Sequence, residues 1–177
     1  WSLGGYLAPR AASGEKRIAA LIADPGLWSI ADGFRTFLVK SFGLVPEAAA
    51  NLDELDQRII EKIDAAITGN PSWNWKIRKR GYWTHGVDNL RAYFASAELF
   101  TMSGHADRIS CPTLITQAEN DPLASGARNF FDALSCPKTF MRFTAAEGAD
   151  GHCEMRNRSL LNRRVLDWLD EQFDVRP

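Results

Sequence analysis

The chain has 177 residues, of which 45% are hydrophobic, and this size suits one globular body with a real core. Its 21 basic and 22 acidic residues give a formal net charge of −1, so neither nucleic acid nor a membrane surface is expected as a partner. No stretch approaches the roughly 18 consecutive apolar residues of a membrane-spanning helix.

The cysteines are odd in number and scattered. Cys111, Cys136 and Cys153 show no C-x-x-C spacing, which argues against both a disulfide framework and a zinc site. We therefore expect packed thiols, no metal, no cofactor and a reducing cytoplasmic location.

The first residues, Trp1 to Tyr6, contain a Ser-Leu-Gly-Gly string that predicts a nucleophile elbow around Ser2. This sharp strand-to-helix turn needs small neighbours so that the serine Oγ stands exposed, and Gly4 is expected to meet that need. Gly5 is expected to allow close approach of the following helix to the sheet. The motif would lack its first glycine and its supporting strand, as in a serine hydrolase without its front half. Plain turns explain such short strings too.

Three later segments predict buried strands of a parallel sheet. Ile18–Ala23 is an unbroken apolar run, Thr113–Ala118 follows Cys111-Pro112, and Thr139–Phe143 is rich in β-formers. Amphipathic stretches at 124–134 and 157–173 predict helices after the second and third strands. Strands that alternate with helices indicate the α/β class and, with the elbow, the α/β-hydrolase fold.

Residues 28–104 interrupt this alternation. They show helical periodicity at 30–42 and 52–67, then an aromatic segment, and no convincing strand. We expect a helical cap over a pocket, inserted between an N-terminal part, 1–27, and a C-terminal part, 105–177. A helical subdomain that only adds core is the alternative.

Acyl transfer by a serine needs a base, a carboxylate that orients the base, and donors for the oxyanion. Ser2, Asp121 and His152 follow one another in the order found in α/β hydrolases, and each stands in a loop at a strand's carboxyl end. The Leu3 N–H would be one oxyanion donor. The alternatives for the base are His85 and His105, and those for the acid are Asp24 and Glu119.

Several segments together resemble the α/β hydrolases related to 2,6-dihydropseudooxynicotine hydrolase and to fungal pigment hydrolases that shorten polyketide chains. The resemblance spans essentially the whole chain and is weakest over residues 35–70. It rests on Ser2–Ala12, Arg17–Ala20, Ala23–Gly26, Ile109–Leu114, Asn120–Pro122 and Glu147–Glu154.

This resemblance implies that Ser2, Asp121 and His152 are nucleophile, acid and base, and that the missing N-terminal half of the fold is supplied by the same or a separate chain. A small-molecule acyl substrate is expected, of aryl or polyketide type because the inserted segment is rich in large rings. Trp73, Trp75, Trp83 and His85 are the candidate substrate contacts, and core packing is the alternative for the tryptophans. An acyltransferase or cyclase, a non-catalytic binding module and a homodimer stay open.

Overall fold

The computed structural model describes residues 1–174, so the last three residues of the expected C-terminal part, 105–177, lie outside the described residues. The chain divides into two compact units. The first, which we call the sheet unit, consists of Trp1–Asp32 and Thr101–Pro177, and the second, the helical unit, is Gly33–Phe100. The helical unit falls inside the expected insertion, and its role as a cap stays a prediction.

The sheet unit is built on three parallel strands in the order β1-β2-β3. They are β1, Leu21–Ala23, β2, Thr113–Ala118, and β3, Lys138–Phe143. Thr113 is opposite Leu21 on one side and Lys138 on the other. The central strand β2 is buried at all but one position, which explains its apolar sequence. The predicted α/β class with a parallel sheet is confirmed.

The first strand is shorter than the run Ile18–Ala23 that predicts it. Its ladder begins at Leu21, whose N–H donates to the carbonyl oxygen of Pro112 at 2.9 Å. Pro112 has no N–H of its own, and the partner strand β2 starts only at Thr113. Residues 18–20 are apolar but have no strand beside them with which to pair.

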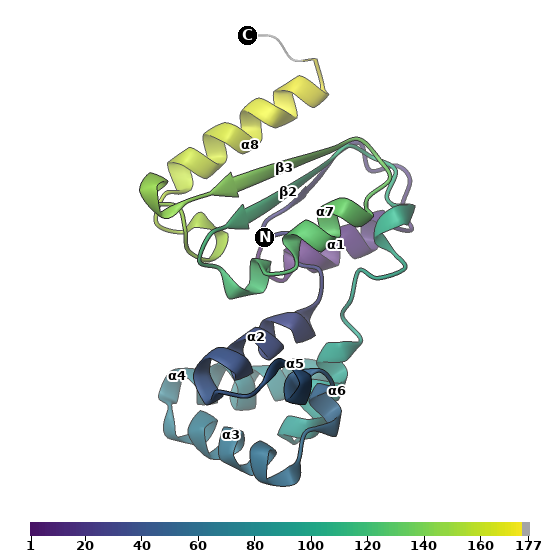
Figure 1. Cartoon of the computed structure of the whole chain (residues 1–177). Helices are drawn as coiled ribbons and strands as arrows, with labels where there is room; N and C mark the ends of the chain where they lie inside the picture. Colours follow the sequence, from purple (N-terminus) through teal and green to yellow (C-terminus); the bar gives the residue numbers. More distant parts are fainter. Residues whose placement is uncertain (175–177) are drawn as a thin grey trace. The chain divides into compact units, whose positions relative to one another are not determined.

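Three helices flank the sheet: α1, Gly4–Ala12, α7, Ala127–Ala133, and α8, Arg158–Gln172. Figure 1 shows α8 on one side of the sheet and α1 and α7 on the other. The indole Nε1 of Trp168, in α8, donates to Thr139 Oγ1 at 3.0 Å, which fixes this helix against β3. The helix expected over 124–134 begins only at Ala127, because Pro122–Ala124 forms a separate 3₁₀ turn.

The helical unit contains most of α2, Ile30–Phe42, and all of α3, Gln57–Gly69, α4, Pro71–Trp73, α5, Tyr82–His85, and α6, Leu90–Glu98. A π-helical stretch, Asn74–Gly81, joins α4 to α5. The helix predicted over 52–67 starts at Gln57 because Asp56 caps it, accepting the Arg58 N–H at 2.8 Å. Among its described residues this unit has no strand, as predicted. The core includes Leu38, Ile60, Ile63, Ile67, Leu90 and Phe94.

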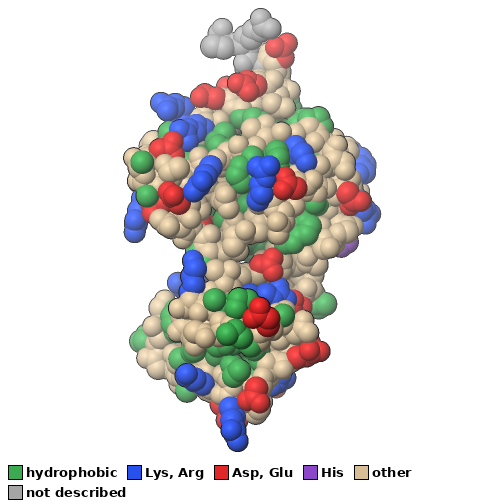
Figure 2. All heavy atoms as spheres, in the orientation of Figure 1, with side chains coloured by type: hydrophobic (Ala, Val, Ile, Leu, Met, Phe, Trp, Pro, Cys, Tyr) green, Lys and Arg blue, Asp and Glu red, His purple; other side chains and the backbone are tan. Residues whose placement is uncertain are grey.

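The surface carries both signs of charge. On the face drawn in Figure 2, acidic and basic side chains are interspersed over each unit, and neither sign gathers into an extended area. This distribution agrees with the net charge of −1. No helix within residues 1–174 combines the length and the apolar character that crossing a membrane requires.

Candidate active site

Ser2 occupies a strained turn directly before α1. Its φ is +55°, in the left-handed region that non-glycine residues seldom adopt. The Ser2 N–H donates to the carbonyl oxygen of Asp24 at 2.7 Å, and the Ser2 carbonyl accepts the Gly5 N–H at 2.7 Å. The turn is thus tied to the loop after β1 on one side and to the first turn of α1 on the other. Such a strained turn is what a nucleophile elbow requires.

The steric demand for a small residue in this turn falls on Gly5. A Cβ atom at Gly5 would lie 2.1 Å from the carbonyl oxygen of Pro25, so any side chain would force the helix away from the loop after β1. A Cβ atom at Gly4 would have no heavy atom within 4 Å among the described residues. The expectation that the turn needs Gly4 for space is therefore wrong, and the close approach expected at Gly5 is present.

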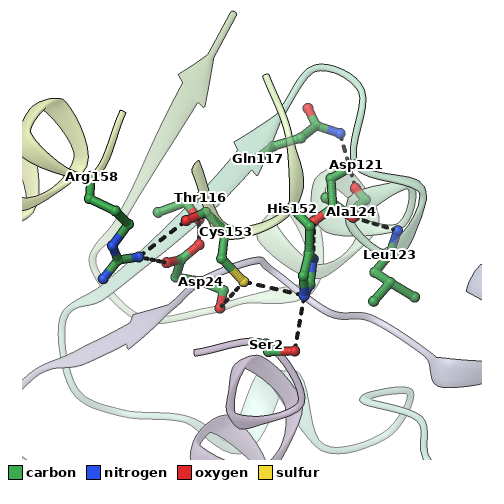
Figure 3. A network of polar contacts seen from close by, with 10 residues as sticks. All are labelled: Ser2, Asp24, Thr116, Gln117, Asp121, Leu123, Ala124, His152, Cys153 and Arg158. Atoms are coloured by element: carbon green, nitrogen blue, oxygen red, sulfur yellow. Dashed lines mark hydrogen bonds and ion pairs between the residues drawn. The ribbon is translucent and has the colours of Figure 1, made fainter. Parts of the chain in front are cut away.

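Three side chains from distant parts of the sheet unit form one hydrogen-bonded series (Figure 3). Ser2 Oγ lies 2.9 Å from His152 Nε2, and His152 Nδ1 lies 2.8 Å from Asp121 Oδ2. Asp121 follows β2 and His152 stands in the loop after β3, so the carboxyl ends of two parallel strands bring them together. The geometry suits proton transfer from the hydroxyl to an imidazole whose tautomer the carboxylate holds.

The acid of this series is buried and the imidazole is partly open. The Asp121 side chain is 0% exposed and that of His152 is 39% exposed. Hydrogen bonding to Asp121 raises the pKa of His152, and Cys153, whose Sγ lies 3.4 Å from His152 Nε2, adds to this rise. Asp121 thus favours the imidazolium that forms when Ser2 loses its proton.

The other candidate acids have different partners. Asp24 Oδ1 accepts the hydroxyl of Thr116 at 3.0 Å, and Glu119 Oε2 accepts the Ala145 N–H at 2.9 Å. Of the three carboxylates weighed from the sequence, Asp121 is the one with a hydrogen bond to His152.

The other histidines also lie in separate surroundings. His85 Nδ1 is 2.7 Å from Ser96 Oγ, and its ring packs on Tyr93 and Phe100, all within the helical unit. Burial lowers the pKa of His85. The Nδ1 atom of His105 is buried and has no hydrogen-bond partner within residues 1–174.

The backbone amide of Leu3 is available as a donor. The Ser2 amide donates to the Asp24 carbonyl, and the amides of Gly4 and Gly5 donate to carbonyls of the turn, whereas that of Leu3 has no acceptor in the described part of the chain. An amide in this position could bind an oxyanion formed at Ser2. Its catalytic use stays a prediction.

The four predicted substrate contacts have two kinds of environment in the helical unit. The Trp73 ring packs edge-on against Phe37 at 5.0 Å, and His85 belongs to the aromatic cluster described above. Trp75 and Trp83 are 57% and 81% exposed. Packing accounts for Trp73 and His85, whereas the exposed indole of Trp75 is covered on one face by the Arg80 guanidinium, 5.4 Å from its ring centre. A role in substrate binding stays a prediction for all four.

A group of polar residues beside the series was not among the predicted site residues. Asp24, weighed only as an alternative acid, and Glu154 are buried, and Arg158 lies 3.7 Å from an Asp24 oxygen. In the sequence, only their positions could have indicated a place near the site. Glu154 follows His152 by two residues, and Asp24 ends the first apolar run. Over residues 1–174 no group of three or more His, Cys, Asp or Glu side chains is arranged to hold a metal ion.

No family model matches the chain. The curated proteins that it resembles are named hydrolases. Hydrolase LUC6 of a Fusarium species is 26% identical over 183 residues, which cover 99% of this chain and 42% of the relative. Hydrolase acrC of Aspergillus aculeatus is 22% identical over 187 residues, covering 99% of this chain and 41% of the relative. The chain resembles fungal hydrolases over nearly all of its length. The resemblance predicted from the sequence is confirmed.

This chain spans about two fifths of the length of the curated relatives it matches. Among solved structures, an enol-lactonase from Burkholderia xenovorans LB400 matches with a TM-score of 0.49 and 15% identity. That match covers 94% of this chain and 62% of the enol-lactonase.

Proposed function

We propose that this chain carries the catalytic residues of a serine hydrolase that cleaves an ester, a thioester or a carbon–carbon bond beside a ketone. The observation that carries the proposal is the hydrogen-bonded series from Ser2 through His152 to Asp121. The strained turn at Ser2 supports it, because such strain is common where a nucleophile is held for reaction. The names of the two fungal relatives support the same class of reaction.

In the proposed mechanism, Ser2 Oγ attacks the carbonyl carbon of the substrate while His152 Nε2 takes the hydroxyl proton. The Leu3 N–H donates to the resulting oxyanion. When the tetrahedral intermediate collapses, the bond to the leaving group breaks and the His152 imidazolium returns its proton to that group. Water then attacks the acyl-enzyme with His152 as base, which releases the acid and restores Ser2. One oxyanion donor is worth about 3 kcal/mol in such reactions.

We further propose that the acyl group is aryl or polyketide-like and that it contacts the helical unit. The exposed indoles of Trp75 and Trp83 support this, since large rings give much contact area to an apolar ligand. The second oxyanion donor would come from a segment of the fold outside these residues.

A fluorophosphonate probe tests the nucleophile, because an activated serine displaces its fluoride and becomes covalently labelled. We expect labelling of the peptide that contains Ser2, and loss of labelling in Ser2→Ala and His152→Ala. Ser159→Ala is the matched control, since Ser159 is an exposed serine on α8. Labelling that survives Ser2→Ala would refute the assignment. Hydrolysis itself is tested with oxygen-labelled water, which must place its label in the acid product.

A further inference from the structure

Glu154 is a carboxylic acid in an unusual place. It is 0% exposed, and neither of its carboxyl oxygens has a hydrogen-bond partner within the described part of the chain. An ionised carboxylate in such a position would be very costly, so a buried acid of this kind is retained in its neutral form. A neutral carboxyl carries an O–H that can donate a hydrogen bond.

Three charged groups face Glu154, each from a different element of the sheet unit. Asp24 follows β1, Asp121 follows β2, and Arg158 begins α8. Burial is the main cause that raises the pKa of Glu154 to about 9, and the Asp24 carboxylate and then Asp121 raise it further. Arg158 opposes this rise only in part. Glu154 is therefore protonated at neutral pH, close to the Asp24 carboxylate.

Asp24 connects this carboxyl to the nucleophile. Its backbone carbonyl accepts the Ser2 N–H at 2.7 Å, and its side chain accepts the Thr116 hydroxyl at 3.0 Å. Its second carboxylate oxygen lies 3.7 Å from Arg158 Nη1 (Figure 3). A shift of Asp24 would therefore move the backbone that holds Ser2.

Arg158 connects the same carboxylate to the base. Its Nη1 donates to the carbonyl oxygen of Cys153 at 3.1 Å, directly after His152. Cys153 and Glu154 have φ values of +53° and +51°, so two successive non-glycine residues are left-handed. Such a segment persists only where its surroundings hold it in place. The Glu154 N–H also donates to Gly151 O at 2.8 Å.

We propose that Asp24, Glu154 and Arg158 act together as a positioning cluster that sets the distance between Ser2 Oγ and His152 Nε2. Asp24 and Arg158 join the turn at Ser2 to the loop of His152, and the neutral Glu154 is buried near both without adding a second negative charge. This inference deepens the proposed function and rests on it.

The test compares rates of fluorophosphonate labelling and turnover of an aryl ester in the wild type and in two variants at Glu154. Glu154→Gln keeps the shape and an N–H donor, so we expect a kcat within about threefold of the wild type. Glu154→Leu replaces the polar group beside Asp24 and Arg158 with a branched apolar side chain, and a nucleophile and base displaced by about 1 Å should lower kcat by about 100-fold with little change in KM. Equal rates for Glu154→Leu and the wild type would overturn the inference.

The pH profile supplies a readout that mere packing would not change. In the wild type, Glu154 ionises near its pKa of about 9 and then repels Asp24 and Asp121, so we expect kcat to fall at alkaline pH. Glu154→Gln should lack this alkaline fall. An identical alkaline limb in the two proteins would count against the cluster.

A second variant keeps the inference testable if Glu154→Leu does not fold. Arg158 is partly exposed, so Arg158→Met should fold, yet it loses both the contact with Asp24 and the bond to Cys153. We expect slower labelling by at least tenfold, whereas Arg163→Met, at an exposed position on α8, should label at the wild-type rate. Wild-type labelling by Arg158→Met refutes the cluster. Failure of the proposed hydrolase function can be told apart from failure of the cluster. In that case the wild type and Ser2→Ala would show the same labelling and the same turnover.

Discussion

Asp121 is held from two sides while it faces His152. Its Oδ2 lies 2.8 Å from His152 Nδ1, and its Oδ1 accepts the Leu123 N–H at 3.0 Å. The second bond caps the 3₁₀ turn Pro122–Ala124 and favours the orientation in which the carboxylate faces the imidazole. Both the position and the orientation of the carboxylate that raises the pKa of His152 are thus held by hydrogen bonds.

Asp121→Asn should therefore change both the rate and its pH dependence. An amide can hold the wrong imidazole tautomer, and the corresponding change in a serine protease triad costs about 10,000-fold in kcat. With His152 as the proposed base, activity should rise with pH as its imidazolium loses a proton. Without the Asp121 charge the pKa of His152 is lower, so the acidic limb of kcat/KM should move to lower pH.

Asp132→Asn is the matched control for this change, since Asp132 is an exposed carboxylate paired with Arg128 on α7. It should leave both the rate and the acidic limb unaltered. An acidic limb that stays in place in Asp121→Asn would show that another group sets the pKa of His152.

The two glycines of the elbow should respond differently to alanine. Gly5→Ala places a Cβ atom 2.1 Å from the Pro25 carbonyl oxygen, and overpacking against backbone of this kind costs about 1–3 kcal/mol. Gly4→Ala meets open space at the start of α1 and should be neutral or stabilising by up to about 1 kcal/mol. Urea unfolding of the two variants gives the comparison. Equal stability of the two proteins would contradict the contact with Pro25.

Glu154 should make the stability of the fold depend on pH. Its pKa in the folded state is about 9, against about 4.3 in an unfolded chain, so the folded state binds the extra proton between these values. Stability from this group is fully present below pH of about 4.3 and is lost as pH rises towards 9. The free energy of unfolding should therefore fall more between pH 6 and pH 9 in the wild type than in Glu154→Gln. Glu171→Gln, on the exposed side of α8, should behave as the wild type does.

The sequence predicts the parts of this site that depend on strand ends. Asp121 and His152 stand after apolar runs that form β2 and β3, and parallel strands bring such loops to one edge. Glu154 could not be predicted in the same way, because a charged residue next to a loop is ordinarily exposed. It is buried in a left-handed turn with Cys153, and nothing in the local sequence indicates this turn.

In the helical unit, sequence-based prediction fails for a different physical reason. Periodicity finds α2 because that helix is regular over Ile30–Phe42. It does not find the π-helical stretch Asn74–Gly81, whose period differs from that of an α-helix. Nor does it separate a packed tryptophan from an exposed one, because both are large apolar residues in one aromatic segment.

Trp73 and Trp83 provide the experiment that separates packing from substrate binding. Trp73→Ala removes a partly buried ring that contacts Phe37 within the helical unit, so it should lower stability by about 1–3 kcal/mol. Trp83 is 81% exposed, so Trp83→Ala should leave the unfolding transition in place. If its indole contacts the acyl group, KM for an aryl ester should rise about tenfold, equivalent to about 1.4 kcal/mol, while KM for an acetyl ester stays constant. An equal KM for both esters in Trp83→Ala and the wild type would remove this indole from the proposed substrate contacts and leave the Ser2–His152–Asp121 series unaffected.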